Sequence, residues 1–373
     1  MRPGPGRPAN MNGDNPVSMP AVKNIRQGLR LFLALTAVGL VFVLYRSSFS
    51  GSIESLSVFR WQYLVLALAL VLLDWVLAGL RIYVFAVRLR PGISFTGCVR
   101  AGLANIFMGG VTPSQTGGGP GQIFVLYKEG MPVFDAMVVS FLGAFLGTVL
   151  FLPLCSLLFL VLFDPVAVDF RLHYLLLGSL AVFIFLIALA AAGLVDPALV
   201  KRAVRSAAAA VPPLKRVLER KGYLDSADRL VDRYNSMMRF FLAEGKSAFA
   251  IGFILSAAIY INKFTIAWVV LRGMGIAAPY TDVIYTQLVL IMIFYFAPSP
   301  GAAGLAEISA AEVMKGIVPA ASAGAYVLLW RLFTLLIGLC AGALVMVRYF
   351  YRGRMEEEAR DTGNSSNLSL IHI

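Results

Sequence analysis

The feature that most constrains this chain is a series of apolar segments, each long enough to cross a membrane and nearly free of charge. In a bilayer, about 20 apolar helical residues cross the hydrocarbon layer, and backbone polar groups there must be satisfied within the helix. Only 14% of the 373 residues are charged, well below the usual share in soluble proteins. The sequence therefore predicts an all-α, polytopic membrane bundle with six full spans, at 29–45, 61–87, 133–163, 173–194, 247–271 and 323–347.

Two motifs rich in Pro and Gly interrupt this pattern. The first reads TPSQTGGGPGQ and begins at Thr112, and the second reads PSPGAAGLAE and begins at Pro298. A constant offset of 185 residues (298 minus 113) aligns four positions of the two motifs: Pro113 with Pro298, Ser114 with Ser299, Gly119 with Gly304, and Gln122 with Glu307.

Each motif follows a short apolar helix, predicted at 97–110 and 283–297. Because proline lacks an amide donor and glycine loses much backbone entropy, both motifs end a helix. Broken backbone at membrane depth is tolerated only where protein or a water-filled cavity satisfies its polar groups. The motifs are therefore either surface loops or two re-entrant halves of a buried site, and their repetition favours the buried site.

The chain divides into a membrane domain and two tails. Residues 1–22 are predicted to be disordered, 23–350 to form the transmembrane domain, and 351–373 to form a cytoplasmic tail. Within the domain, 196–246 carries many Lys and Arg residues, and its apolar residues recur every three or four positions. This spacing predicts a cytoplasmic amphipathic hairpin lying against the membrane.

The distribution of Lys and Arg predicts the orientation. Basic residues cluster before the first span, after the second, in 196–246 and after the last span. The positive-inside rule then places both termini in the cytoplasm. In that arrangement the two motifs enter from opposite faces, so the halves form an inverted repeat, which is typical of transporters.

The sequence lacks the residue patterns that several classes of function require. The net charge of +12 lies beside apolar spans, which suits anionic lipid and not nucleic acid. The cysteines (98, 155 and 340) lack metal-ligand spacing, and two histidines cannot build a zinc site or a catalytic triad. The Gly-rich motif is not GxxxxGK[ST], so no ATP site is expected. We expect no metal, no cofactor and no catalytic residue.

Ionisable residues inside spans are costly and are therefore candidates for function. They are Asp74, Arg81, Lys263 and Arg331, with Gln122 and Glu307 beside the motifs. Arg331 and Lys263 suit the phosphate of a lipid headgroup, and Asp74 and Glu307 suit proton transfer. Asp74 could instead pair with Arg81 or Arg331 as a structural contact; we favour the phosphate role for Arg331.

The first motif, the following YKEG at 127–130, the second motif and Trp330-Arg331 together resemble the lysylphosphatidylglycerol synthase transmembrane, or flippase-like, family over about 25–350. The resemblance implies a polytopic domain of the inner cell membrane that moves lipids between leaflets. It also implies site roles for nine residues: Pro113, Gln115, Gly118, Gln122, Pro298, Gly301, Gly304, Glu307 and Arg331. No segment after 350 resembles the family's soluble acyltransferase domain, so a separate enzyme is expected to modify the lipid.

The leading hypothesis is a translocase for a phospholipid or a polyprenyl-phosphate-linked lipid, with an anionic headgroup as the expected ligand. A membrane glycosyl- or aminoacyl-transferase is one alternative, although the predicted external loops are short. A proton-coupled small-solute transporter is another, because of the intramembrane carboxylates. A transporter is favoured over an enzyme.

Overall fold

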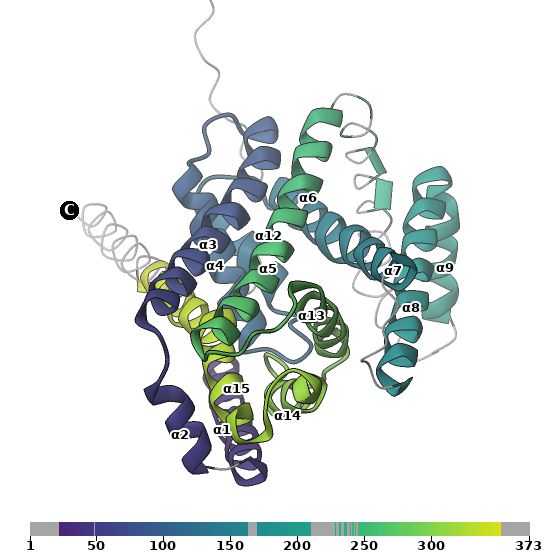
Figure 1. The fold of residues 1–373 in the computed structure, drawn as a ribbon. Helices are drawn as coiled ribbons and strands as arrows, with labels where there is room; N and C mark the ends of the chain where they lie inside the picture. Colours follow the sequence, from purple (N-terminus) through teal and green to yellow (C-terminus); the bar gives the residue numbers. More distant parts are fainter. Residues whose placement is uncertain are drawn as a thin grey trace, which may run out of the picture.

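In the computed structural model, the chain is a bundle of helices (Figure 1). The structure describes residues 22–47, 49–162, 170–209 and 245–351, together with 228, 231, 232, 235, 236, 239, 241 and 243. No β-strand occurs in these ranges, which confirms the all-α prediction. The predicted disordered tail and most of the C-terminal tail lie outside the described residues.

The first part of the chain runs through α1 (Val22–Arg46), α2 (Phe49–Ser57), α3 (Trp61–Leu89), α4 (Phe95–Gly110), α5 (Gly118–Lys128) and α6 (Val133–Ala144). A π-helical segment, η1 (Phe145–Phe151), then joins α6 to α7 (Leu152–Leu162). After these come α8 (Phe170–Val195), α9 (Pro197–Ala209), α12 (Lys246–Gly273), α13 (Tyr280–Tyr295) and α14 (Leu305–Val313). Two short 3-10 turns, η2 (Met314–Gly316) and η3 (Ala320–Ser322), precede α15 (Ala323–Arg331) and the π-helical η4 (Leu332–Leu336).

Five described helices are long and apolar enough to cross a membrane: Ile25–Arg46, Trp61–Leu89, Val133–Leu162, Lys246–Gly273 and Ala320–Tyr351. They coincide with five of the six predicted spans. The remaining prediction, 173–194, falls within α8, a helix of 26 residues whose side chains are only partly described. The two motif loops lie between shorter helices, as the sequence predicts.

An internal repeat organises these helices. Adding 187 to a residue number (300 minus 113, the two prolines that pair) carries α4 onto α13 and α5 onto α14, each within a few residues. The same shift carries α3 onto α12 and the start of η1, Phe145, onto the start of η4, Leu332. The repeat therefore includes the hairpins, the span before each and the π-helical segment after each.

The repeat is inverted, because its first members, α3 and α12, pack in opposite directions. Arg60 near the start of α3 contacts Gly273 at the end of α12, and Arg88 near the end of α3 contacts Ser247 at the start of α12. Figure 1 shows the two helices side by side through the middle of the molecule. Equivalent helices of an inverted repeat must run antiparallel, as these do.

Pro153, the second residue of α7, follows the wider π-helical segment η1. A proline within a helix removes one amide donor and crowds the preceding turn, and a wider turn relieves that crowding. No proline accompanies η4, so the repeat of the π-helical segment is not a proline effect alone.

Two parts lie outside the repeat. Helices α1 and α2 pack at one side of the molecule, and α8 and α9 lie at the other (Figure 1). Within the segment predicted as an amphipathic hairpin, α9 is helical, and its Lys201 and Arg205 pair with Asp232 and Asp228 at 2.6 and 2.5 Å. Most of 210–244 lies outside the described residues.

Candidate functional site

The two motif loops meet each other. Pro113 and Pro300 form an isolated antiparallel bridge, and the Ser114 hydroxyl donates to the carbonyl of Ala297 at 3.2 Å. The reverse contact also exists: a Cβ on Gly301 would lie 3.0 Å from the carbonyl of Gly110. Shifting by 187 exchanges these two contacts, so the tips of the hairpins lie about the pseudo-two-fold axis of the repeat.

The register between the motifs differs from the one predicted. The structural equivalent of Pro113 is Pro300 and not Pro298, so the offset of 185 is wrong by two residues. Backbone dihedrals support 187: Ser114 and Gly301 have φ of +50° and +54°, and Gln115 and Ala302 both have +56°. The sequence match misled because Pro113 can be aligned with either Pro298 or Pro300, and the backbone geometry selects Pro300.

A buried ion pair holds the second loop. The Arg331 Nε donates to Glu307 Oε1 at 2.7 Å, and an Nη donates to the Gly301 carbonyl at 3.1 Å. The other carboxylate oxygen of Glu307 accepts from the Gly304 amide at 2.6 Å. Glu307 lies at the third position of α14, where a carboxylate caps free amides. Gly304 has φ of +80°, a conformation that side chains disfavour.

Different chemistry holds the first loop. Gln122, buried in α5, accepts from the Asn105 amide at 3.0 Å and donates to the Ser140 hydroxyl at 2.9 Å. Because the true offset is 187, Gln122 and Glu307 are not equivalent positions. Gly118 packs against α4, where a Cβ would lie 2.9 Å from Asn105 Oδ1. The two hairpins therefore share a backbone shape and differ in their side-chain contacts.

The loops also differ in exposure. Pro113 and Gln115 are exposed, as is Pro298 at the edge of the second loop, whereas Gly301 is buried. Helix α1 provides this cover: its Phe32 lies against Gly301, and its Gly39 allows close approach to Glu307. The predicted motif residues thus divide into two groups. Pro113, Gln115 and Pro298 are exposed, and four others are buried: Gly118, Gln122, Gly301 and Glu307.

The YKEG segment is explained by Glu129. Its carboxylate accepts from Arg100 at 3.1 Å and from Ser94 at 3.4 Å, and Tyr349 of the last span also donates to it. Gly130 next to it has φ of +90°. This cluster ties the open end of the first hairpin to the last span.

A line of polar side chains runs between α3 and α12. Asp74 and Lys263 form an ion pair at 2.8 Å, so the predicted pairing of Asp74 with Arg81 or with Arg331 is wrong. Lys263 lies across the antiparallel interface at the level of Asp74, whereas Arg331 faces Glu307. Next to this pair, Asn262 donates to the Leu70 carbonyl at 2.9 Å.

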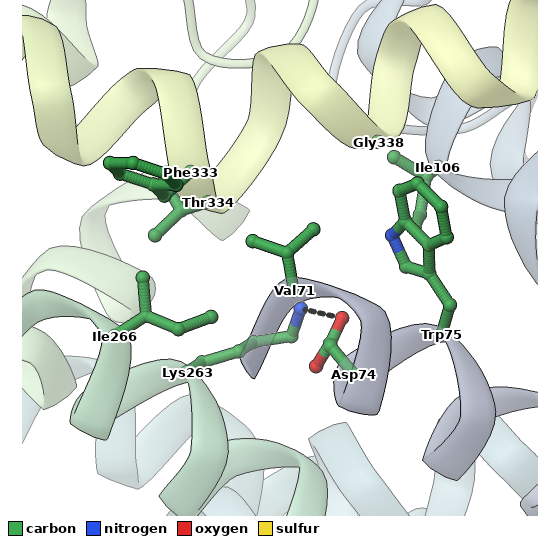
Figure 2. Close-up of a pocket in the computed structure, with 9 residues that line it drawn as sticks. All are labelled: Val71, Asp74, Trp75, Ile106, Lys263, Ile266, Phe333, Thr334 and Gly338. Carbon is green, nitrogen blue, oxygen red and sulfur yellow. Dashed lines mark hydrogen bonds and ion pairs between the residues drawn. The ribbon is translucent and has the colours of Figure 1, made fainter. Parts of the chain in front are cut away.

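The Asp74–Lys263 pair lines a pocket between α3, α12, α4 and the last span (Figure 2). Val71, Trp75, Ile106, Ile266, Phe333, Thr334 and Gly338 complete its walls. Asp74 is 6% exposed, and its second carboxylate oxygen is buried without a hydrogen-bond partner. A buried carboxylate oxygen without a donor is costly, so this oxygen is a candidate for binding a proton or a cation.

Arg81 lies two helical turns beyond Asp74 on the same side of α3, about 10 Å away along the axis. Its guanidinium donates to the Ser256 hydroxyl at 3.2 Å, and its Nε is buried without a partner. It also packs against Gly143 and Gly147 of the α6–η1 helix. Among the described residues, no carboxylate lies within ion-pair distance of it.

The sequence prediction missed the hydroxyl-bearing residues near Arg81. Thr148 and Tyr295 form a hydrogen bond at 2.7 Å, and the Tyr260 hydroxyl lies 3.3 Å from that of Tyr295. In the sequence these residues are visible only as single polar residues within otherwise apolar spans. Their joint position depends on η1 and on the packing of α12, which one sequence does not reveal.

The described residues contain no group of three or more His, Cys, Asp or Glu residues that could hold a metal ion. The arrangement places charged groups within the helix bundle: the Asp74–Lys263 pair beside the pocket, and Arg81 among hydroxyls. Both positions lie between the two halves of the repeat.

Comparison with known proteins agrees with this architecture. A curated relative, an Archaeoglobus fulgidus protein described as "UPF0104 membrane protein", is 23% identical over 321 residues, which are 85% of this chain and 94% of the relative. The family model described as "Lysylphosphatidylglycerol synthase TM region" matches residues 29–342, which include both hairpins and the whole repeat. The chain therefore belongs to the lysylphosphatidylglycerol synthase transmembrane-region family.

Proposed function

We propose that this protein is a lipid translocase that moves a lipid with a phosphate-bearing headgroup between the leaflets of a membrane. The observation that carries the proposal is the meeting of two inverted, broken hairpins at Pro113 and Pro300. In transporters built from inverted repeats, the substrate site lies between the halves, and rocking one half against the other opens it to either face.

The line of polar residues between α3 and α12 supports a lipid as the substrate. A headgroup needs polar partners while it crosses the hydrocarbon layer, and the acyl chains need none. Arg88, Arg81 and Asp74 with Lys263 follow one another along this interface. Many side chains on the outer faces of α1 and α3 are large, apolar and exposed, as contact with acyl chains requires.

The test is translocation in vesicles that contain the purified full chain. Phosphatidylglycerol with a fluorescent acyl chain is placed in both leaflets, and an impermeant reductant is added outside. We expect protein-free vesicles to lose only the outer-leaflet signal and protein-containing vesicles to lose nearly all of it within minutes. Loss limited to the outer leaflet in both samples would refute the proposal.

One observation favours a second candidate, a proton-coupled solute transporter. Asp74 lines a pocket, and a proton bound at its unpartnered carboxylate oxygen would satisfy that buried atom. In that case a pH gradient across the vesicle should drive uptake of a water-soluble solute, and Asp74→Asn should abolish the response to the gradient. Lipid translocation that is independent of the gradient distinguishes the first function from the second.

A further inference from the structure

We propose that Arg81 and the hydroxyl groups around it form the binding site for the phosphate of the lipid headgroup. This inference rests on the proposed function and specifies where the substrate is held. It differs from the sequence prediction, which favoured Arg331 for the phosphate.

The first step is a comparison of charges. Of the three cations that the sequence places inside spans, Arg331 pairs with Glu307 at 2.7 Å and Lys263 pairs with Asp74 at 2.8 Å. Arg81 has no carboxylate within ion-pair distance among the described residues. An arginine inside a membrane span is costly, so an uncompensated one indicates an anion that arrives from elsewhere.

The second step is the shape of the space beside the guanidinium. A Cβ on Gly147 would lie 2.8 Å from an Arg81 Nη, 3.4 Å from the Tyr260 ring and 3.7 Å from the Ser256 hydroxyl. Gly147 belongs to η1, and π-helical segments inside helices often occur at functional sites. The missing side chain at this position therefore lets the guanidinium pack directly against η1, beside the Tyr260 ring and the Ser256 hydroxyl.

The third step is the supply of additional donors. Thr148, Tyr260 and Tyr295 bring three hydroxyls within hydrogen-bond distance of one another, at 2.7 to 3.4 Å. Hydroxyls can donate to a phosphate oxygen and can otherwise satisfy one another, so this cluster is stable with and without a ligand. An arginine that has a free Nε can bind two phosphate oxygens at once.

Arg331 is a poorer candidate for the same role. It is 4% exposed, and both its carboxylate partner and the Gly301 carbonyl occupy its donors. A phosphate there would have to displace Glu307, which also caps the second loop. Arg81 needs no such displacement.

The first experiment measures binding to the purified full chain in detergent by calorimetry. The probes are dihexanoyl-phosphatidylglycerol, inorganic phosphate and dihexanoylglycerol, which lacks the phosphate. We expect the phospholipid to bind, the neutral lipid not to bind, and Arg81→Gln to lower the phospholipid affinity at least about 10-fold, because a charge-assisted hydrogen bond is lost. Arg90→Gln, at the exposed C-cap of the same helix, is the matched control and should bind as wild type does.

Steric variants test the same site without changing its charge. Gly147→Ala places a methyl group 2.8 Å from an Arg81 Nη and should displace the guanidinium. Gly102→Ala in α4 is the control, because its methyl meets Ala78 and Ile82 at an ordinary 3.7 Å. We expect weaker phospholipid binding only in Gly147→Ala. Thermal unfolding without ligand identifies any variant that has lost its fold, and Arg81→Lys then serves as the charge-retaining variant, with binding between those of wild type and Arg81→Gln.

The outcomes separate this inference from the proposed function. If wild-type protein translocates lipid and Arg81→Gln binds and translocates equally well, the Arg81 site is wrong and the translocase stands. If binding depends on Arg81 but vesicles show no translocation, the phosphate site is supported and the translocase function is refuted. Equal affinity for inorganic phosphate and the phospholipid would overturn the assignment to a lipid.

Discussion

At the residue scale, buried charges show how the two halves differ. Glu307 is 0% exposed and Arg331 4%, and together they hold the amide of Gly304 and the carbonyl of Gly301. In the first half, the neutral Gln122 instead links the side chains of Asn105 and Ser140. An ion pair is the stronger constraint once formed, because removing one partner leaves an uncompensated buried charge.

We therefore predict that Glu307→Leu and Arg331→Leu each lower the free energy of unfolding by about 3–5 kcal/mol. The double variant should recover part of that loss, because it leaves no unpaired charge, although the Gly304 amide remains without its acceptor. Thermal unfolding in detergent measures all three. The exposed pair Glu312–Lys315 is the control, and its loss should cost less than about 1 kcal/mol. A single Leu variant as stable as wild type would contradict the structural role.

At the element scale, the hairpins are the units that the repeat duplicates. Each consists of a helix, a turn with two consecutive residues at positive φ, and a second helix. Ser114 and Gln115 adopt this conformation without being glycine, at a cost of about 1–2 kcal/mol each. The contacts between the two paired turns offset this backbone strain.

The register of this pairing can be tested by crosslinking in a variant whose three natural cysteines are replaced by alanine. We expect Pro113→Cys with Pro300→Cys to form a disulfide under mild oxidation, since bridged residues have neighbouring Cα atoms. The control pair, Pro113→Cys with Pro298→Cys, corresponds to the 185-residue offset and should crosslink poorly. Electrophoretic mobility after protease cleavage reports the bond, and preferential crosslinking of the control pair would restore the other register.

At the scale of the whole molecule, α3 and α12 form the central antiparallel pair, and each half builds outward from one of them. The large contact between these two helices buries apolar residues and also contains the polar line from Arg88 to Asn262. A substrate path along this line would be shared equally by both halves. That sharing is what alternating access between two faces requires.

The prediction at this scale concerns the orientation of the two halves in the membrane. In a variant without the natural cysteines, Gly92→Cys should react with an impermeant thiol reagent only from the cytoplasmic face, and Ala320→Cys only from the other. Both positions are exposed; Gly92 precedes the first hairpin and Ala320 follows the second. A re-entrant hairpin begins and ends at one face, so an inverted repeat must place the two positions on opposite faces. Labelling of both residues in intact cells would be incompatible with the inversion.

The sequence by itself determined the class of protein, the hairpins and most spans. Apolar length and the helix-ending chemistry of Pro and Gly are local properties, so they can be read without a fold. The costly charges inside spans could be listed for the same reason: Asp74, Arg81, Lys263 and Arg331 all lie inside described helices.

Only the tertiary structure decided which charges meet and how the halves align. The partner of Asp74 depends on the rotation of α12 against α3, and the partner of Arg331 on the position of α14. The offset of 187 follows from backbone dihedrals and from the pairing of Pro113 with Pro300, which residue identity does not encode. Long-range contacts depend on how helices pack, and the same local pattern is compatible with several registers between helices. Burial of apolar side chains and the pairing of polar groups determine which register forms.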